Sequence, residues 1–483
     1  MNQGIEIVTS ESEQILSNVK KQVFATVIAN IVIFSHGCCV GWVSPALPVL
    51  LSDDTPITTG PISNEQLSWV GSMSNFGSIC GTFIFGTLTA FLGSKRSMIF
   101  LAFPQIIFWL LILFGDTYYH IIIGRLAAGI SGGGIQTGVV LFVAEISNNN
   151  IRGRLGSFTP LIRNIGLLIG FFVGGVVRYE YRPYVFISLP IIYLIWLFYL
   201  PNTPQYYLKN ADFDRAEKAL MFYKNCDGNN DREKTHLNAE MERLKLIDDE
   251  QKNSPKIQMN DFCNRMALKG VIVSVAVSWL CQMTGGSTFT NYASFMFEKS
   301  GTSLGIHISS IILAVAQIVG GLISTQLGDT FGRKTTLNIS LLGSAGGLFT
   351  FATFMYLHHI GYDLSNFLWI PVTSLSLIIF ISYAGIQALI NTCVVECFSP
   401  KIRTIGMIFY SFCLNGIAFG VDKTFPILLE IIGMHSVMLI MAINCCLGIV
   451  FIAFMKETKG QSIDTMDTTS ETKSPANNEQ NKA

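Results

Sequence analysis

The apolar residues of this chain gather in long blocks separated by short polar stretches, and they do not recur at the period of a surface helix or a strand. The blocks run for roughly 18–25 residues, the length that a helix needs to cross about 30 Å of hydrocarbon. Because every backbone N–H and C=O must be paired internally inside lipid, each block is predicted to be a helix. A dozen spans are predicted, near 22–44, 67–88, 97–115, 119–143, 157–178, 183–200, 268–292, 306–326, 336–357, 367–392, 405–429 and 434–455.

The connections between these blocks differ in their content of basic residues. Alternate connections and the two ends of the chain carry pairs of Lys or Arg, and the long loop at 205–267 carries many more. The other connections are nearly bare, with Arg178, Arg182 and Lys299 as exceptions. Cytoplasmic loops are the ones enriched in Lys and Arg, so both termini are predicted to be cytoplasmic. The first 20 residues lack the apolar core of a signal peptide. We therefore expect the first span to direct insertion, into the plasma membrane.

Composition narrows the class of protein further. Hydrophobic residues make up 50% of the chain and charged residues 13%, and the mean hydropathy is +0.46. A soluble chain carries about a quarter charged residues. The net charge of zero argues against a nucleic-acid partner and leaves the lipid bilayer as the expected environment. The 11 cysteines form no C-x-x-C pair or Cys/His cluster, so we expect no metal and no other cofactor. No nucleophile–base arrangement or phosphate-binding loop suggests an enzyme.

The sequence also repeats itself. Glu145 precedes Arg152 by the same spacing that separates Glu396 from Arg403, and both pairs lie at the predicted cytoplasmic exit of a span. Parallel six-helix repeats are the construction of major facilitator carriers. The predicted fold is therefore an all-α membrane protein of twelve transmembrane helices in two six-helix pseudo-repeats. Its parts are a cytoplasmic N-terminus at 1–21, a first half at 22–204, helical cytoplasmic linkers at 205–267, a second half at 268–455 and a largely disordered cytoplasmic tail at 456–483.

Short motifs connect the chain to a family. They are Gly41-Trp-Val-Ser-Pro45, Gly124-Arg125, Ala144-Glu145-Ile with Arg152-Gly153, Asp329-Thr-Phe-Gly-Arg-Lys334, Glu396 with Pro400 and Arg403, Lys423-Thr-Phe-Pro426, and Glu457-Thr-Lys-Gly-Gln-Ser462. In this order and spacing they resemble the sugar-porter branch of the major facilitator superfamily, and in detail the insect facilitated trehalose transporter group. The resemblance covers about 22–462.

The charged motif residues suggest a gate. Acids and bases at cytoplasmic helix ends can pair across the two halves, close the inner mouth, and separate as the halves rock. The alternative is that they only anchor helices at the membrane surface. Ala90, Asn202 and Gln205 depart from the family pattern in the first half, which predicts a weakened inner gate. The candidates are Arg125, Glu145, Arg152, Asp329, Arg333, Lys334, Glu396, Arg403 and Glu457.

A sugar pocket needs amide and hydroxyl side chains and an aromatic face. The resemblance places this pocket at mid-membrane, where span seven keeps one of the family's two glutamines and span ten has lost its prolines and tryptophan. The alternative for each polar residue is an interhelical hydrogen bond, worth about 0.6 kcal/mol. The candidates for substrate binding are Gln282, Thr284, Ser287, Asn291, Tyr292, Gln317, Asn391, Asn415 and Arg163.

Arg163 is the one charged residue among these candidates. It lies about 9 Å into the predicted fifth span, at 1.5 Å per residue. Its side chain either extends to the cytoplasmic surface or lines the pathway, where it would pair with Asp422, another acid, or a substrate carboxylate or phosphate.

The leading prediction is a carrier of a small-molecule sugar, a hexose or trehalose, that works as a monomer by alternating access. Proton-linked members of the family use an acid in span one, and the corresponding stretch here, Ser35 to Gly41, has none. This favours facilitated uniport, with His36 expected to pack as a neutral imidazole instead of carrying a proton. Two alternatives remain open: a transporter-like sugar sensor without turnover, and a carrier of a non-sugar solute such as an anion.

Overall fold

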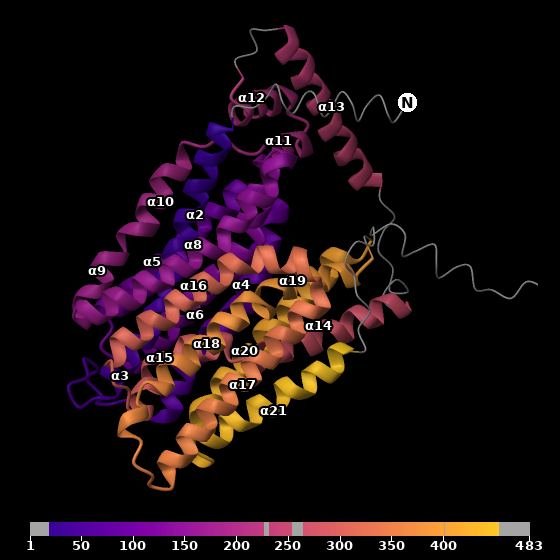
Figure 1. Cartoon of the computed structure of the whole chain (residues 1–483). Coiled ribbons are helices and arrows are strands. Elements are labelled where there is room, and N and C mark those ends of the chain that lie inside the picture. Colours follow the sequence, from indigo (N-terminus) through magenta and orange to yellow (C-terminus); the bar gives the residue numbers. More distant parts are fainter. Residues whose placement is uncertain (1–18, 227–230, 254–263, 400, 454–483) are drawn as a thin grey trace, which may run out of the picture.

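The computed structural model describes residues 19–226, 231–253, 264–399 and 401–453, and these residues form helices joined by short turns (Figure 1). The prediction of an all-α membrane protein is confirmed, because the described residues contain twelve helices long and apolar enough to span a bilayer. These spans are Lys20–Leu51, Asn64–Leu92, Ser94–Phe114, Tyr118–Ile146, Asn150–Val176, Tyr179–Phe198, Met266–Ser300, Ile306–Ser324, Arg333–His359, Ser365–Cys397, Arg403–Ile431 and Met434–Ala453.

Spans one, four, seven and ten are each interrupted along their length. Pro45 lacks the N–H that would bond to Gly41 in span one, and Gly285 adopts φ +78° in span seven. Irregular backbone at membrane depth is tolerated only where protein or a water-filled cavity surrounds it, so these breaks mark the interior of the bundle. The pieces are α2 (Lys20–Gly41) and α3 (Val43–Leu51); α6 (Tyr118–Gly134), the π-turn η1 (Ile135–Val139) and α7 (Val140–Ile146); α14 (Arg265–Met283) and α15 (Gly286–Ser300); and α18 (Ile370–Ala384) and α19 (Ile386–Cys397).

The remaining spans are mostly continuous helices, although span six is divided at Ile187. Three further helices connect the halves. The continuous spans are α4 (Asn64–Leu92), α5 (Ser94–Phe114), α8 (Asn149–Val176), α16 (Ile306–Phe331), α17 (Arg333–His359), α20 (Arg403–Ile431) and α21 (Met434–Ala453). Span six consists of η2 (Tyr179–Tyr181), α9 (Arg182–Phe186) and α10 (Ser188–Phe198), and the linker contains α11 (Pro204–Lys209), α12 (Phe213–Lys224) and α13 (Asp231–Asn253).

The two halves repeat one packing scheme. Their first span packs on their fifth, as α2 with α8 and α14 with α20, and their second on their fourth, as α4 with α6 and α16 with α18. Small residues permit these close approaches: a Cβ on Gly77 of α4 would lie 2.3 Å from the carbonyl oxygen of Leu126 on α6. Close packing of small residues drives helix association inside lipid, where the hydrophobic effect is absent.

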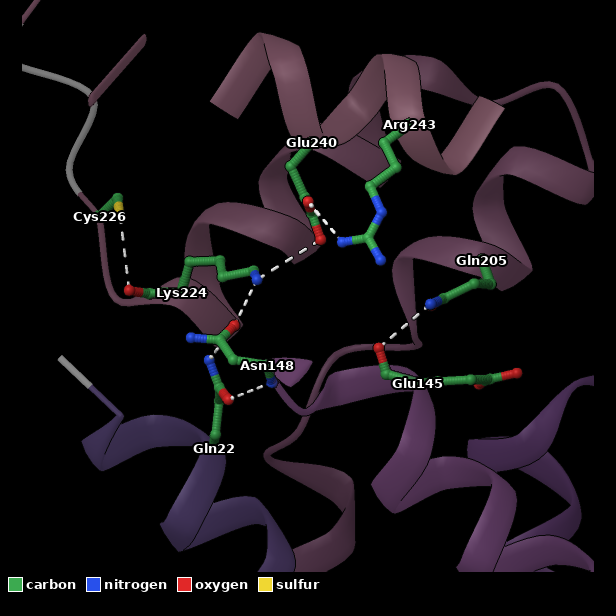
Figure 2. A network of polar contacts seen from close by, with 8 residues as sticks. All are labelled: Gln22, Glu145, Asn148, Gln205, Lys224, Cys226, Glu240 and Arg243. Carbon is green, nitrogen blue, oxygen red and sulfur yellow. Dashed lines mark hydrogen bonds and ion pairs between the residues drawn. The ribbon is translucent and has the colours of Figure 1, made fainter. Parts of the chain in front are cut away.

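A polar network joins the linker helices to the first half (Figure 2). Lys224 at the end of α12 donates to the side chain of Asn148, whose backbone N–H donates to Gln22 of α2 at 3.0 Å. Lys224 also lies 3.6 Å from Glu240 of α13. These contacts place the linker at the end of the bundle where α2 begins. We call this the linker end, and the opposite end, where α3 meets α4, the far end.

Candidate functional site between the two halves

The halves pack against each other through pairs of helices related by the repeat. The second span of each half packs on the fifth span of the other, as α4 with α20 and α16 with α8. At the far end the side chains interlock. Ser44 of α3 donates to Ser294 of α15 at 3.0 Å, and Asn64 of α4 donates to Glu430 of α20 at 3.0 Å. The far end of the interface is therefore closed.

Asp422 of α20 lies at the inner boundary of this closed region. Its carboxylate is fully buried and accepts hydrogen bonds from Asn75 of α4 at 2.9 Å, from Thr288 of α15 at 2.5 Å and from Asn291 at 2.9 Å. The Tyr292 hydroxyl donates to the Asp422 backbone carbonyl at 2.9 Å. Donors from both halves thus converge on one acid, and they compensate for its removal from water.

Arg125 supports the same region. It is fully buried in α6, and its guanidinium donates to the backbone carbonyls of Val70 at 3.0 Å and Gly71 at 3.4 Å. The Tyr292 ring packs against Gly71, where a Cβ would lie 1.9 Å from the tyrosine hydroxyl. Arg125 therefore lies in the far half of span four, away from the linker-end charges with which the sequence grouped it.

The span-seven candidates lie around the break between α14 and α15. Ser287 donates to Gln282 at 2.6 Å, and Thr284 shares a 2.7 Å hydrogen bond with Ser382 of α18. Gln387 of α19 reaches the same break, because a Cβ on Gly286 would lie 2.2 Å from its amide nitrogen. The structure thus brings Gln282, Thr284 and Ser287 together.

A second polar group connects α15 to the first half. Thr290 of α15 donates to Gln317 of α16 at 3.2 Å, and Gln317 donates to Asn164 of α8 at 2.9 Å. Tyr383 of α18 adjoins this group through Thr290. In this state Gln317 therefore forms interhelical hydrogen bonds that connect the two halves.

Two candidates lie apart from these groups. Asn415 of α20 is buried and donates to the Ser411 carbonyl of its own helix at 2.8 Å. Asn391 of α19 is exposed, and no hydrogen bond from it is found among the described residues. Gln136, in the π-turn of span four, accepts a 3.4 Å hydrogen bond from Ser411 across the halves.

The first-half charges at the linker end stay within their own half. Glu145 accepts a hydrogen bond from Ser94 of α5 at 2.5 Å, and its backbone carbonyl accepts one from Gln205 at 3.1 Å (Figure 2). Arg152 is exposed, and no acid lies within ion-pair distance of it in the described part of the chain. Gln205, which departs from the family pattern, thus serves as a helix-end contact.

The linker-end charges of the second half have different kinds of partners from those of the first half. Glu396 of α19 lies 3.6 Å from Arg333 of α17, and Lys334 donates to the Ala453 carbonyl at 2.7 Å. Two nitrogens of Arg403 are buried without a hydrogen-bond partner among the described residues. Glu396 thus has an ion-pair partner, Arg333, inside its own half. Of the other gate candidates, the Asp329 side chain and Glu457 lie outside the described residues.

Comparison with known proteins decides the family. The model of the family described as "Sugar (and other) transporter" matches residues 50–469, which is most of the chain. The chain belongs to this family.

Curated relatives support the membership of this chain in the family, and the similarity covers nearly the whole chain. "Facilitated trehalose transporter Tret1" of Culex quinquefasciatus is 27% identical over 457 residues, covering 93% of this chain and 86% of the relative. The protein of the same name from Polypedilum vanderplanki is 26% identical, covering 92% of this chain and 88% of the relative. That from Aedes aegypti is also 26% identical, but this chain spans only 54% of it.

Solved structures show that the transporter has the major facilitator fold. The inward-open conformation of the xylose transporter XylE from E. coli superimposes with a TM-score of 0.76 at 18% identity, covering 93% of this chain and 99% of XylE. XylE bound to 6-bromo-6-deoxy-D-glucose superimposes with a TM-score of 0.67 at 20% identity, covering 94% of this chain and 99% of XylE.

Sequence reasoning missed several residues of the site of this transporter. Asn75, Thr288, Asn164, Tyr383 and Gln387 all lie in spans and contact candidate residues. For Asn75, Asn164 and Gln387 the available signal was an amide side chain in an apolar block, since such a group needs a hydrogen-bond partner inside lipid. That signal gives no partner, because the partner comes from another helix.

Proposed function

We propose that this protein is a plasma-membrane carrier that moves a small sugar, a hexose or trehalose, by alternating access as a facilitated uniporter. The observation that carries the proposal is the asymmetry of the interface between the halves. Hydrogen bonds join the halves from the far end to mid-membrane. At the linker end, Glu145 accepts a hydrogen bond from Ser94 of its own half, and Glu396 pairs with Arg333 of its own half. An interface closed at one end is what one state of a rocking carrier requires.

The positive-inside pattern supports the orientation of this carrier. Lys and Arg concentrate at the linker end, so we assign that end and both termini to the cytoplasm. The closed far end then faces outside. We propose that the protein works as a monomer surrounded by lipid, since each half already packs on the other.

The groups around the break in span seven suit a sugar. Gln282, Ser287 and Gln387 supply amide and hydroxyl groups that both donate and accept, at the break in span seven and its neighbour in span ten. These groups bind hydroxyls without breaking bonds, which favours a carrier over an enzyme. The names of the curated relatives, facilitated trehalose transporters, support a sugar as the substrate.

Uniport follows from where the acids lie. Span one has no carboxylate between Ser35 and Gly41. The buried acid in the bundle, Asp422, already accepts hydrogen bonds from Asn75, Thr288 and Asn291. We assign Asp422 to closing the far end, and expect no proton to move with the sugar.

Uptake into proteoliposomes tests the proposal. We expect radiolabelled glucose or trehalose to enter down its gradient, with initial rates that stay the same when an imposed pH gradient is collapsed. Binding of sugar without uptake would instead indicate a sensor. A several-fold loss of rate on collapse of the gradient would overturn uniport and point to Asp422 or His36 as a proton carrier.

A further inference from the structure

Arg163 lies near the middle of its helix. The fifth span begins with α8 at Asn149 and ends at Val176, so Arg163 is about 20 Å from either end of α8 at 1.5 Å per residue. The helix begins several residues before the apolar block, so its first residue does not mark the membrane surface. Whether the side chain extends to the surface or lines the pathway therefore depends on its neighbours.

The surroundings of Arg163 are polar and lie between the halves. Its side chain is partly accessible and adjoins Tyr383 of α18, which belongs to the other half. The Arg163 backbone packs against Gly37 of α2, and the ring of the preceding residue, His36, packs against Gly132 of α6. The His36 ring is buried, and its Nδ1 has no hydrogen-bond partner among the described residues.

The charge of Arg163 is not balanced by the protein. No acid lies within ion-pair distance of it in the described part of the chain. The carboxylate of Asp422, the expected partner, is occupied by Asn75, Thr288 and Asn291. Tyr383 and His36 add groups able to donate hydrogen bonds, but neither is an anion.

We propose that Arg163, Tyr383 and His36 form a subsite for an anionic group, a carboxylate or phosphate, on the transported sugar. The subsite rests on the carrier function proposed above and widens its substrate class to acidic sugars. A cation at the centre of a bilayer is costly unless it is paired. A bound anion removes that cost, and the planar guanidinium offers parallel donors to carboxylate or phosphate oxygens. A neutral sugar leaves the charge uncompensated.

Uptake ratios in proteoliposomes test the subsite. Glucuronate and glucose 6-phosphate are compared with glucose and trehalose for the wild type, Arg163→Gln, Arg163→Lys and Tyr383→Phe. We expect Arg163→Gln to lower the ratio of anionic to neutral uptake about tenfold or more, because a hydrogen bond to a charged group is lost. Arg163→Lys should restore part of the ratio, and Tyr383→Phe should lower it less. The two anions separate a carboxylate-binding from a phosphate-binding site.

Arg178→Gln is the matched control, because Arg178 is an exposed arginine whose side chain is 80% accessible. It should leave the ratio unchanged. The ratio is measured on the same vesicles, so it does not depend on the fraction of protein that folds. Uptake of neutral sugars with the same anion ratio in the wild type and Arg163→Gln would overturn the subsite and leave the carrier intact. No uptake of any of the four compounds would overturn the carrier and the subsite together.

Discussion

The two ends of the interface between the halves use their polar residues in opposite ways. At the far end, Lys423 of α20 donates to Ser68 of α4 at 2.8 Å and lies 4.0 Å from the centre of the Trp69 ring, so charge and aromatic surface connect the halves. At the linker end, Glu145 accepts a hydrogen bond from Ser94 and Glu396 pairs with Arg333, each within its own half.

The difference shows how a repeat can serve a two-state carrier. Equivalent acids in the two halves have distinct partners, a hydroxyl for Glu145 and a guanidinium for Glu396. Alanine stands at position 90, where the family has an acid, and the first half therefore lacks one member of its charge set. At the far end the contacts join α4 to α20 through Ser68 and Lys423, and α3 to α15 through Ser44 and Ser294.

Locking the far end should have the largest effect. Asn64 and Glu430 are hydrogen-bonded across the halves at 3.0 Å, so cysteines at both positions should be joined by a short bifunctional thiol reagent. A carrier that cannot open this end cannot complete its cycle, and sugar uptake should fall to background. Each single cysteine variant is the control and should keep its uptake after the same treatment. Full uptake by the cross-linked protein would show that the far end does not need to open.

The linker-end acids should respond unequally to neutralisation. Glu396→Gln removes the ion pair with Arg333. The side chains of Glu396 and Arg333 are 19% and 21% accessible, and an ion pair near the surface contributes about 1 kcal/mol at most. We expect about fivefold faster labelling of cysteines placed along the linker-end pathway. Glu145→Gln still accepts from Ser94, so its labelling rate should change less than about twofold. Equal rates for the two variants would contradict the unequal connections described above.

Detaching the linker should have the smallest effect on transport. Lys224→Met removes the contacts to Asn148 and Glu240 (Figure 2), and we expect faster amide hydrogen exchange in α12 and α13. Lys218→Met, an exposed change on the same helix, is the control. Uptake should stay within about twofold of the wild type, because none of these residues lies between the halves. A complete loss of uptake would place the linker in the transport cycle itself.

The family and the fold could be read from the sequence to a large extent. Twelve apolar blocks, the spacing of the Glu145 and Glu396 motifs and the order of the other motifs predicted a two-half carrier, and this is confirmed by the twelve spans and the family match. Span boundaries were less accurate, because helices continue past the apolar block. In α8 the helix starts at Asn149, several residues before the predicted boundary.

The site could be predicted only as a set of polar residues. Gln282, Thr284 and Ser287 follow one another along the chain, so their proximity around the span-seven break was predictable. Asn75 and Asp422 are far apart in sequence and meet at 2.9 Å only because α4 packs on α20. Glu396 likewise pairs with Arg333, although its sequence motif contains Arg403.

What the sequence by itself determined is the number of spans, their order, the repeat and the side bearing most positive charge, since these depend on the cost of placing polar groups in lipid, residue by residue. Tertiary structure alone decided which polar groups are partners and which end is closed. Each amide, hydroxyl or charge in a span must find a partner on another helix, and many partners are chemically equivalent. The choice is made by which helix faces meet, and in a carrier those faces change with the state.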